Sequence, residues 1–300
     1  MKMKLTIALL ACAATLSAQN VSVTRHTEVT PEGGAAYFPV LSPDGSKMAY
    51  TSSDYTGLKV LDFTTGNSQV VSFSAGAGFD PVFSTDGSAI YYRQQSTVGG
   101  QKLRSLSEYN LDQKSERQLI APTRDLKRPA AIAGGMAVFA GNKLFKSVGA
   151  RINSLYVYSV AQEGTIVVCD GKTSRVLRPY GNQVRSYLWT TLSPDGTKIA
   201  TYAIGKGVVV LDLDGKVLAE LGDFEAPAWY GNDFVAAART TDDGHQYTAS
   251  QIVLLDRHNR QVHNLTAPDE MGMNPSAAAG KIVYNTPEGK LFMLELNITK

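Results

Sequence analysis

The chain has 300 residues, with 29 basic and 27 acidic side chains, a formal net charge of +2 at pH 7 and two cysteines. It contains no block of like charge that would grip phosphates or anionic lipid, so nucleic-acid binding and direct membrane binding are disfavoured. The longest uncharged apolar stretch of the body, residues 129–141, is too short for a membrane span.

The first 18 residues resemble a secretory signal sequence. A basic start, Met1–Lys4, runs into the apolar stretch Leu5–Leu16, which is too short to span a bilayer and is followed by "SAQ". We expect cleavage after Ala18, which removes two lysines and no acid and leaves 27 basic against 27 acidic groups. The letters "LLAC" ending at Cys12 also resemble a lipobox. The sequence therefore predicts a periplasmic protein, with lipid anchoring through Cys12 or secretion as the alternatives.

A repeated phrase dominates the rest of the chain. Three copies are close, "FPVLSPDGSKMAY" from Phe38, "FDPVFSTDGSAIYY" from Phe79 and "WTTLSPDGTKIATY" from Trp189, and three more are weaker. Aligned on the third residue before the turn, the starts fall 37 to 61 positions apart, at Pro39, Pro81, Pro129, Thr190, Pro227 and Pro275. Self-similarity at this spacing indicates a repeat architecture.

Each close copy describes one turn between two short strands. Proline or threonine leads the turn, an Asp side chain accepts hydrogen bonds from nearby backbone N–H groups, and a Gly takes a positive φ. The residues expected to build these turns are Asp44, Gly45, Asp86, Gly87, Asp195 and Gly196. Two further strands follow, as in "LKVLDFTTGN" and "SQVVSF". Four short antiparallel strands per unit of about 40 to 50 residues are typical of β-propeller blades.

Counting the repeats predicts an all-β, six-bladed propeller over residues 19–300. A seventh blade stays open, because the third repeat, from Pro129, is long enough to hold an irregular one. The last repeat has only three strands, and the lone strand Val21–Thr27 would supply the fourth. That pairing would close the ring and cover its exposed sheet edges.

On these motifs the sequence resembles the TolB-like, WD-like β-propeller repeat family. The match is close at Phe38–Thr51, Asp80–Tyr92 and Trp189–Tyr202, and loose elsewhere. TolB carries an additional N-terminal α/β domain and scaffolds envelope proteins in the periplasm. There is no room for that domain between Ala18 and Phe38, so the resemblance is to the propeller part. It implies a protein-binding role in the cell envelope.

Signals for catalysis are weak. Cys169 lies in the apolar "TIVVCDG", which favours a buried thiol, and the chain has no Gly-x-Ser-x-Gly motif of the peptidases that carry such blades. Some TolB-like propellers are sugar-acid lyases that gather histidines from several blades, an arrangement that the four histidines here do not suggest, namely His26, His245, His258 and His263. We expect no enzymatic activity, no cofactor and no metal.

A binding site is expected where the first strand of each blade begins, at the mouth of the central channel. The residue just before each aligned start is called here a lead residue, and the lead residues are Phe38, Asp80, Arg128, Trp189, Ala226 and Asn274. One step earlier lie Tyr37, Phe79, Lys127, Leu188, Glu225 and Met273. Large aromatics mixed with arginine are typical of binding hot spots. Packing of Phe38 and Trp189 between blades is the plain alternative, and an ion pair between Asp80 and Arg128 is another.

The sequence therefore predicts an exported, non-enzymatic scaffold, monomeric, that binds an envelope protein or peptide segment through Phe38, Asp80, Arg128, Trp189, Asn274 and Tyr37. The alternative is a propeller that binds carbohydrate or another small molecule and acts as a hydrolase or lyase.

Overall fold

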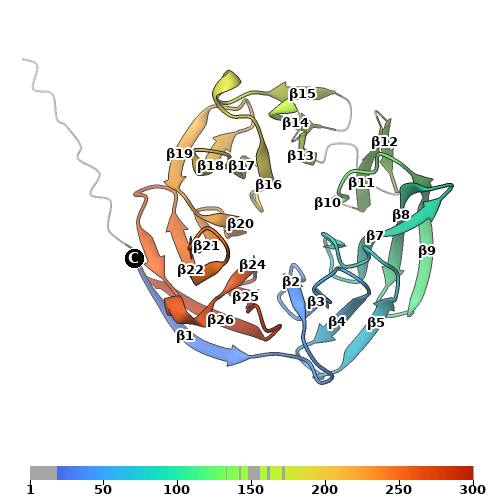
Figure 1. The fold of residues 1–300 in the computed structure, drawn as a ribbon, viewed down its shortest axis with the longest axis horizontal. Helices are drawn as coiled ribbons and strands as arrows, with labels where there is room; N and C mark the ends of the chain where they lie inside the picture. The colour runs from blue at the N-terminus through green and yellow to red at the C-terminus, as the bar shows by residue number, and fades with distance from the viewer. Residues whose placement is uncertain are drawn as a thin grey trace, which may run out of the picture.

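Small antiparallel sheets arranged around a common centre make up the fold (Figure 1). The computed structural model describes residues 19–299 without 133, 142, 148–155, 161–162 and 171–172, and in this part of the chain it has seven sheets. Short 3-10 turns include η2 (Gly181–Gln183) and η3 (Pro268–Glu270). Among the described residues, no helix is long and apolar enough to cross a membrane. The expected signal sequence, residues 1–18 with Cys12, lies outside the described residues.

Five of these sheets have four strands, and in four of them the strands follow chain order. Those four are β2 (Tyr37–Leu41), β3 (Lys47–Thr51), β4 (Leu58–Asp62), β5 (Ser68–Ser72); β6 (Val82–Phe83), β7 (Ala89–Val98), β8 (Gln101–Asn110), β9 (Ser115–Thr123); β16 (Tyr187–Leu192), β17 (Lys198–Ala203), β18 (Gly207–Asp212), β19 (Val217–Gly222); and β20 (Glu225–Tyr230), β21 (Phe234–Asp242), β22 (Tyr247–Asp256), β23 (Val262–Asn264). Two more sheets have three described strands each, β10 (Ala130–Ile132), β11 (Gly135–Ala140), β12 (Lys143–Lys146) and β13 (Tyr156–Val160), β14 (Thr165–Cys169), β15 (Ser174–Leu177).

The remaining sheet joins the two ends of the described chain. Its order is β1 (Asn20–Glu28), β26 (Leu291–Thr299), β25 (Lys281–Asn285) and β24 (Met273–Ala278). Strand β1 pairs with β26 from Asn20 opposite Thr299 to Glu28 opposite Phe292. In Figure 1 it runs along the outer edge of the ring, while the first strands of the other blades lie nearer the centre.

The expected all-β propeller of antiparallel blades is confirmed, but the expected count of six blades is wrong. The repeat that starts at Pro129 contains two separate sheets, β10–β12 and β13–β15, which makes seven. Neither sheet carries a Ser-Pro-Asp-Gly turn, and the 61 positions before Thr190 are enough for two sets of three short strands. The seventh blade that the long third repeat left open is therefore present.

The core is divided among the contacts between neighbouring sheets. One cluster of buried side chains joins β16–β19 to β20–β23 through residues such as Val210 and Val253, and comparable clusters lie between the other neighbours. Cys169 packs with Phe139 between β10–β12 and β13–β15 and is only 3% exposed, so its thiol is buried. Burying apolar area between blades fixes each first strand relative to the next.

Candidate functional site

The two faces of the ring come from the two ends of the first strands. The lead residues lie at or just before the start of these strands and mark what is called here the lead face. The Ser-x-Asp-Gly turns follow the strands and mark the turn face. Neighbouring first strands are aligned side by side. The Phe38 N–H donates to the Asn285 side chain of the adjacent sheet (3.2 Å), and further along β2 the Leu41 N–H donates to the Ser276 hydroxyl (3.1 Å). These bonds tie β2 to the neighbouring blade near both of its ends.

The polar groups of the turns on the turn face bond to one another. In the first turn the Ser42 hydroxyl donates to Asp44 Oδ1 (2.6 Å) and accepts from the Lys47 N–H (2.9 Å), and Asp44 also accepts from the Ser46 N–H (3.0 Å). The turns at Ser84 and Ser193 repeat the same bonds to Asp86 and Asp195. The hydrogen bond from Ser42 is the main reason that the pKa of Asp44 is lowered to about 2. The serine hydroxyl and the aspartate of each of these three turns are therefore held by hydrogen bonds within the turn.

Five lead residues share a left-handed backbone. The φ angles lie between 50° and 52° at Phe38, Asp80, Trp189, Ala226 and Asn274. In four of these blades the pairing register shifts at the same place, as between Tyr37 and Val40 or Leu188 and Thr191. A left-handed φ is uncommon for residues with a side chain and is an outlier for bulky ones. The strained residue at the start of the first strand therefore recurs in five of the seven blades, and Arg128 before β10 does not share it.

The side chains at these positions differ in type and exposure. Trp189 is 47% exposed, Phe38, Ala226 and Asn274 are half-buried, and the exposed Arg128 precedes β10. Tyr37 is half-buried, and its hydroxyl donates to the carbonyl of Pro287 (3.2 Å). Asn274 donates to Asn285 Oδ1 (3.0 Å), the same oxygen that accepts from Phe38. The five lead residues with the left-handed φ thus share a backbone conformation, while their side chains differ between blades.

Aromatic rings cluster around Phe38 on one side of the lead face. The Phe38 ring stacks on Tyr55 with centroids 4.2 Å apart, and Tyr55 meets Phe79 edge to face at 5.0 Å. The Arg93 guanidinium lies over the Phe79 ring, 5.2 Å from its centroid. Phe79 remains 40% exposed, so this surface combines apolar area with a cation.

Asp80 pairs with a residue that the sequence analysis did not consider. Arg93, which is 5% exposed, lies 3.5 Å from the Asp80 carboxylate and donates to the Phe79 carbonyl (3.3 Å). A charged residue within the β-rich "AIYYRQ" was the available signal, because a buried arginine needs a partner.

A second aromatic group lies around Trp189. Its ring meets Tyr202 edge to face at 5.8 Å, and the Tyr202 hydroxyl donates to Asp223 (3.1 Å). Tyr247 donates to Glu225 (3.1 Å), the residue before Ala226. Burial, and then the hydrogen bond to Asp223, raise the pKa of Tyr202, so its hydroxyl stays protonated at neutral pH. This side of the face is aromatic and acidic.

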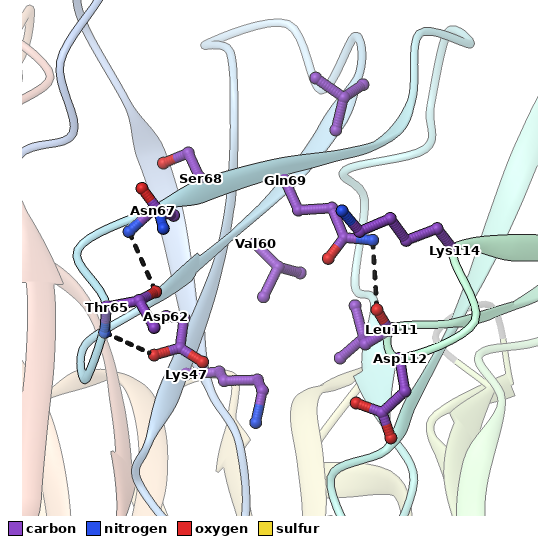
Figure 2. Close-up of a pocket in the computed structure, with 11 residues that line it drawn as sticks. Lys47, Val60, Asp62, Thr65, Asn67, Ser68, Gln69, Leu111, Asp112 and Lys114 are labelled. Atoms are coloured by element: carbon purple, nitrogen blue, oxygen red, sulfur yellow. Dashed lines mark hydrogen bonds between the residues drawn. The ribbon is translucent and has the colours of Figure 1, made fainter.

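Two pockets lie between β2–β5 and β6–β9, one on each face. On the turn face a pocket of about 430 Å³ is polar, and Figure 2 shows Lys47, Asp62, Asp112 and Lys114 around it with Gln69 donating to the Leu111 carbonyl. Its two lysines and two carboxylates balance in charge. On the lead face a pocket of about 280 Å³ includes Tyr55, Phe79 and Arg93.

In the part of the chain that the structure describes, no three or more His, Cys, Asp or Glu side chains lie close enough together to hold a metal ion. His26 contacts the Tyr284 hydroxyl (2.9 Å), and His258 contacts Asp233 (2.9 Å), at separate places.

Comparisons with known proteins agree with this architecture. The sequence matches no protein-family model and no curated protein. Solved structures do match. The WD40 repeats of RRP9 are 12% identical with a TM-score of 0.63, covering 93% of this chain and 100% of that one. TolB from Acinetobacter baumannii is 19% identical with a TM-score of 0.52, covering 78% of this chain and 55% of that one.

The likeness is one of fold. The resemblance to TolB-like and WD-like propellers is thereby confirmed at the level of architecture, and the chain spans just over half the length of the TolB structure. An oligogalacturonate lyase from Vibrio parahaemolyticus is also similar, with 12% identity, a TM-score of 0.51 and coverage of 88% of this chain and 78% of that one. The same fold therefore serves proteins of different function, and function must be argued from the site.

Proposed function

We propose that this protein is an exported, non-enzymatic propeller that binds another protein of the cell envelope at its lead face. The observation that carries the proposal is a contrast within the lead residues. Their strained backbone conformation is shared, but the side chains that it presents differ, as at Phe38, Asp80, Trp189 and Asn274. Strain of this kind persists where the surrounding structure enforces it, and it is common at binding sites. A rigid scaffold with varied side chains is how many binding surfaces are built.

Charge and aromatic content support a polypeptide partner. Arg93 lies beside the Phe38 aromatic group, and the carboxylates of Asp223 and Glu225 lie beside the Trp189 group. An extended peptide offers side chains of both signs and apolar groups at regular spacing, so one segment could contact both groups. Exposed Trp and Arg are the residue types that dominate binding energy in such interfaces.

Export and ring closure are part of the same proposal. Residues 1–18 would direct the chain across the membrane, with Cys12 as the lipid-anchored alternative. Strand β1 would close the ring by its pairing with β26. We expect the mature protein from a bacterial host to begin at Gln19, which mass spectrometry measures. A chain lacking residues 20–28 should unfold at a lower temperature because β26 loses its outer partner.

The test of the binding role is cross-linking capture from native envelope extract. The mature protein is compared with the double variant Trp189→Ala and Arg128→Ala, and with the control double variant Asp112→Ala and Lys114→Ala on the turn face. We expect one protein to be captured by the wild type and the control but lost from the lead-face variant, with all three folded by circular dichroism. Capture that survives the lead-face change would refute the proposal. Binding or cleavage of an oligosaccharide instead would favour the alternative, a sugar-binding or sugar-cleaving propeller.

A further inference from the structure

The pocket on the lead face between the first two blades has the features of a built site. It is called here the inter-blade pocket, and its volume is about 280 Å³. Its lining comes from the β3–β4 turn, the β5–β6 loop and the β7–β8 hairpin, as Asp54, Tyr55, Ala75, Gly76, Phe79, Arg93, Gln94, Gln95 and Arg104. This volume suits one amino-acid residue or another small group rather than a drug-sized ligand.

The walls of the inter-blade pocket are held by backbone contacts. The Gly78 N–H donates to the Tyr55 carbonyl (3.1 Å), and the Gln95 N–H donates to the Ala75 carbonyl (2.8 Å). A Cβ on Gly78 would lie 2.0 Å from Thr51 Oγ1, so the loop approaches the neighbouring blade as closely as a residue without a side chain permits. The pocket is therefore formed before any ligand arrives, which lowers the entropic cost of binding.

The inter-blade pocket has an apolar wall beside a cation, Arg93, whose charge is balanced by Asp80. Tyr55 and Phe79 meet edge to face, and Arg93 covers the Phe79 ring while it pairs with Asp80. An apolar side chain that enters would contact Phe79, which is 40% exposed in the protein alone. Burying that ring supplies the hydrophobic part of the binding energy.

The unused polar groups of the pocket are mainly donors. The Arg104 guanidinium, the Gln95 amide and the Tyr55 hydroxyl have no hydrogen bond or ion pair to the residues that the structure describes. Burial, and then the nearby Asp80, raise the pKa of Tyr55, so its hydroxyl keeps its proton. The carboxylate at the rim, Asp54, already accepts from the Ser52 hydroxyl and from Thr56. A ligand with an anionic acceptor would satisfy the free donors.

We propose that the inter-blade pocket binds the C-terminal residue of a polypeptide, with its carboxylate at Arg104 and Tyr55 and an apolar side chain against Phe79. A peptide is favoured over a small acid because Phe38 stacks on Tyr55 and continues the aromatic surface toward the ring centre, where the preceding residues of the peptide would lie. This inference rests on the proposed function and names which part of the partner is bound.

The experiment titrates mature protein with fluorescent acetyl-Gly-Ser-Ala-Phe as the free acid and as the C-terminal amide, followed by fluorescence anisotropy. We expect the free acid to bind at least about tenfold more tightly, because a charge-assisted hydrogen bond to a carboxylate is lost in the amide. Arg104→Ala should remove that preference, Arg104→Lys should keep part of it, and Asp54→Asn should strengthen binding of the acid. Asp112→Ala, on the other face, should change nothing.

Equal binding of acid and amide, or an acid preference that survives Arg104→Ala, would overturn the inference. Titration with acetyl-phenylalanine alone distinguishes a peptide C-terminus from a small acid as the source of the carboxylate. If it binds as tightly as the peptide, the pocket takes small acids and the polypeptide assignment fails. The capture experiment tests Trp189 and Arg128, which lie outside this pocket. If the wild type captures a partner through them while no peptide binds, only the inter-blade pocket is rejected and the proposed function stands.

Discussion

The two faces of this ring are built from the two ends of the same repeat, yet they differ in what is repeated. On the turn face both backbone and side chains recur, and the Ser and Asp of each turn bond to one another at Ser42, Ser84 and Ser193. On the lead face only the backbone recurs, with φ near 50°. The side chains there change from Phe to Asp, Trp, Ala and Asn.

This difference separates shape from recognition. A motif whose serine and aspartate bond to each other in all three close copies stabilises the turn, so its recurrence reflects the fold. At the lead positions the backbone keeps a strained left-handed conformation while the side chain differs between blades. This pattern indicates a binding surface whose chemistry is set separately in each blade. Both properties can be broken by single substitutions, and four predictions follow from the largest expected effect to the smallest.

Gly78→Val should cause the largest loss of stability, about 3 kcal/mol, because overpacking against a buried side chain forces the backbone to move. The nearest atoms all belong to Thr51, which is 5% exposed and donates to the Gly57 carbonyl (2.6 Å). Urea unfolding measures the change. Gly66→Val on the turn face is the matched control, since its Cβ would meet nothing within 4 Å and only the positive φ opposes it. Equal losses for the two variants would mean that the close approach at Gly78 does not matter.

Ser→Ala changes in the turns should each cost about 1 to 2 kcal/mol, because a buried N–H loses its acceptor. In the first turn that N–H belongs to Lys47, and Ser42 itself is fully buried. Ser84→Ala and Ser193→Ala should behave alike, since Ala89 and Lys198 donate to those hydroxyls. Thermal unfolding gives the loss, and capture of the envelope partner should be unchanged. A turn variant that stays stable but no longer captures the partner would show that binding involves the turn face, which contradicts the proposed function.

The fold was largely readable from the sequence, and the blade count was not. The Ser-Pro-Asp-Gly spacing located the first strands of the close copies, because turn chemistry is local. The lone strand predicted at Val21–Thr27 corresponds to β1. The two blades between Pro129 and Thr190 lack that turn, so nothing marked the boundary between them. The sequence also placed Phe38, Asp80 and Trp189 at equivalent positions, which the structure shows to share one backbone conformation.

The partners of these side chains could not be read in the same way. Tyr55 lies in the β3–β4 turn and Arg93 in the middle of β7, and each contacts Phe38 or Asp80 within its own blade, once the strands of that blade have paired. Repeat alignment compares like positions in different blades, so it does not report contacts between unlike positions.

Acid should reduce the difference between wild type and Ser42→Ala. The pKa of Asp44 is lowered from 3.8 to about 2 chiefly by the hydrogen bond from Ser42. A carboxyl with a depressed folded pKa contributes stability that is fully present above its unfolded value and is lost as pH falls through the folded value. The gap in urea midpoint between the two proteins should therefore be constant from pH 7 to about 5 and shrink between about pH 4 and pH 2. A gap that does not narrow there would show that the serine acts only through the Lys47 N–H.

Ala226→Gly should give the smallest effect and the only gain, about 0.5 kcal/mol. Ala226 is a lead residue with φ of 50°, so glycine removes the steric strain of a Cβ in the left-handed region and loses only one half-buried methyl group. Ala228→Gly, two residues along the same strand and without a positive φ, should instead lose about 0.5 to 1 kcal/mol to added backbone freedom. Opposite signs in urea unfolding would establish that the lead positions hold strain that the ring enforces. A loss at both positions would mean that the left-handed turn is relaxed, and that the varied side chains of the lead face alone carry the case for recognition.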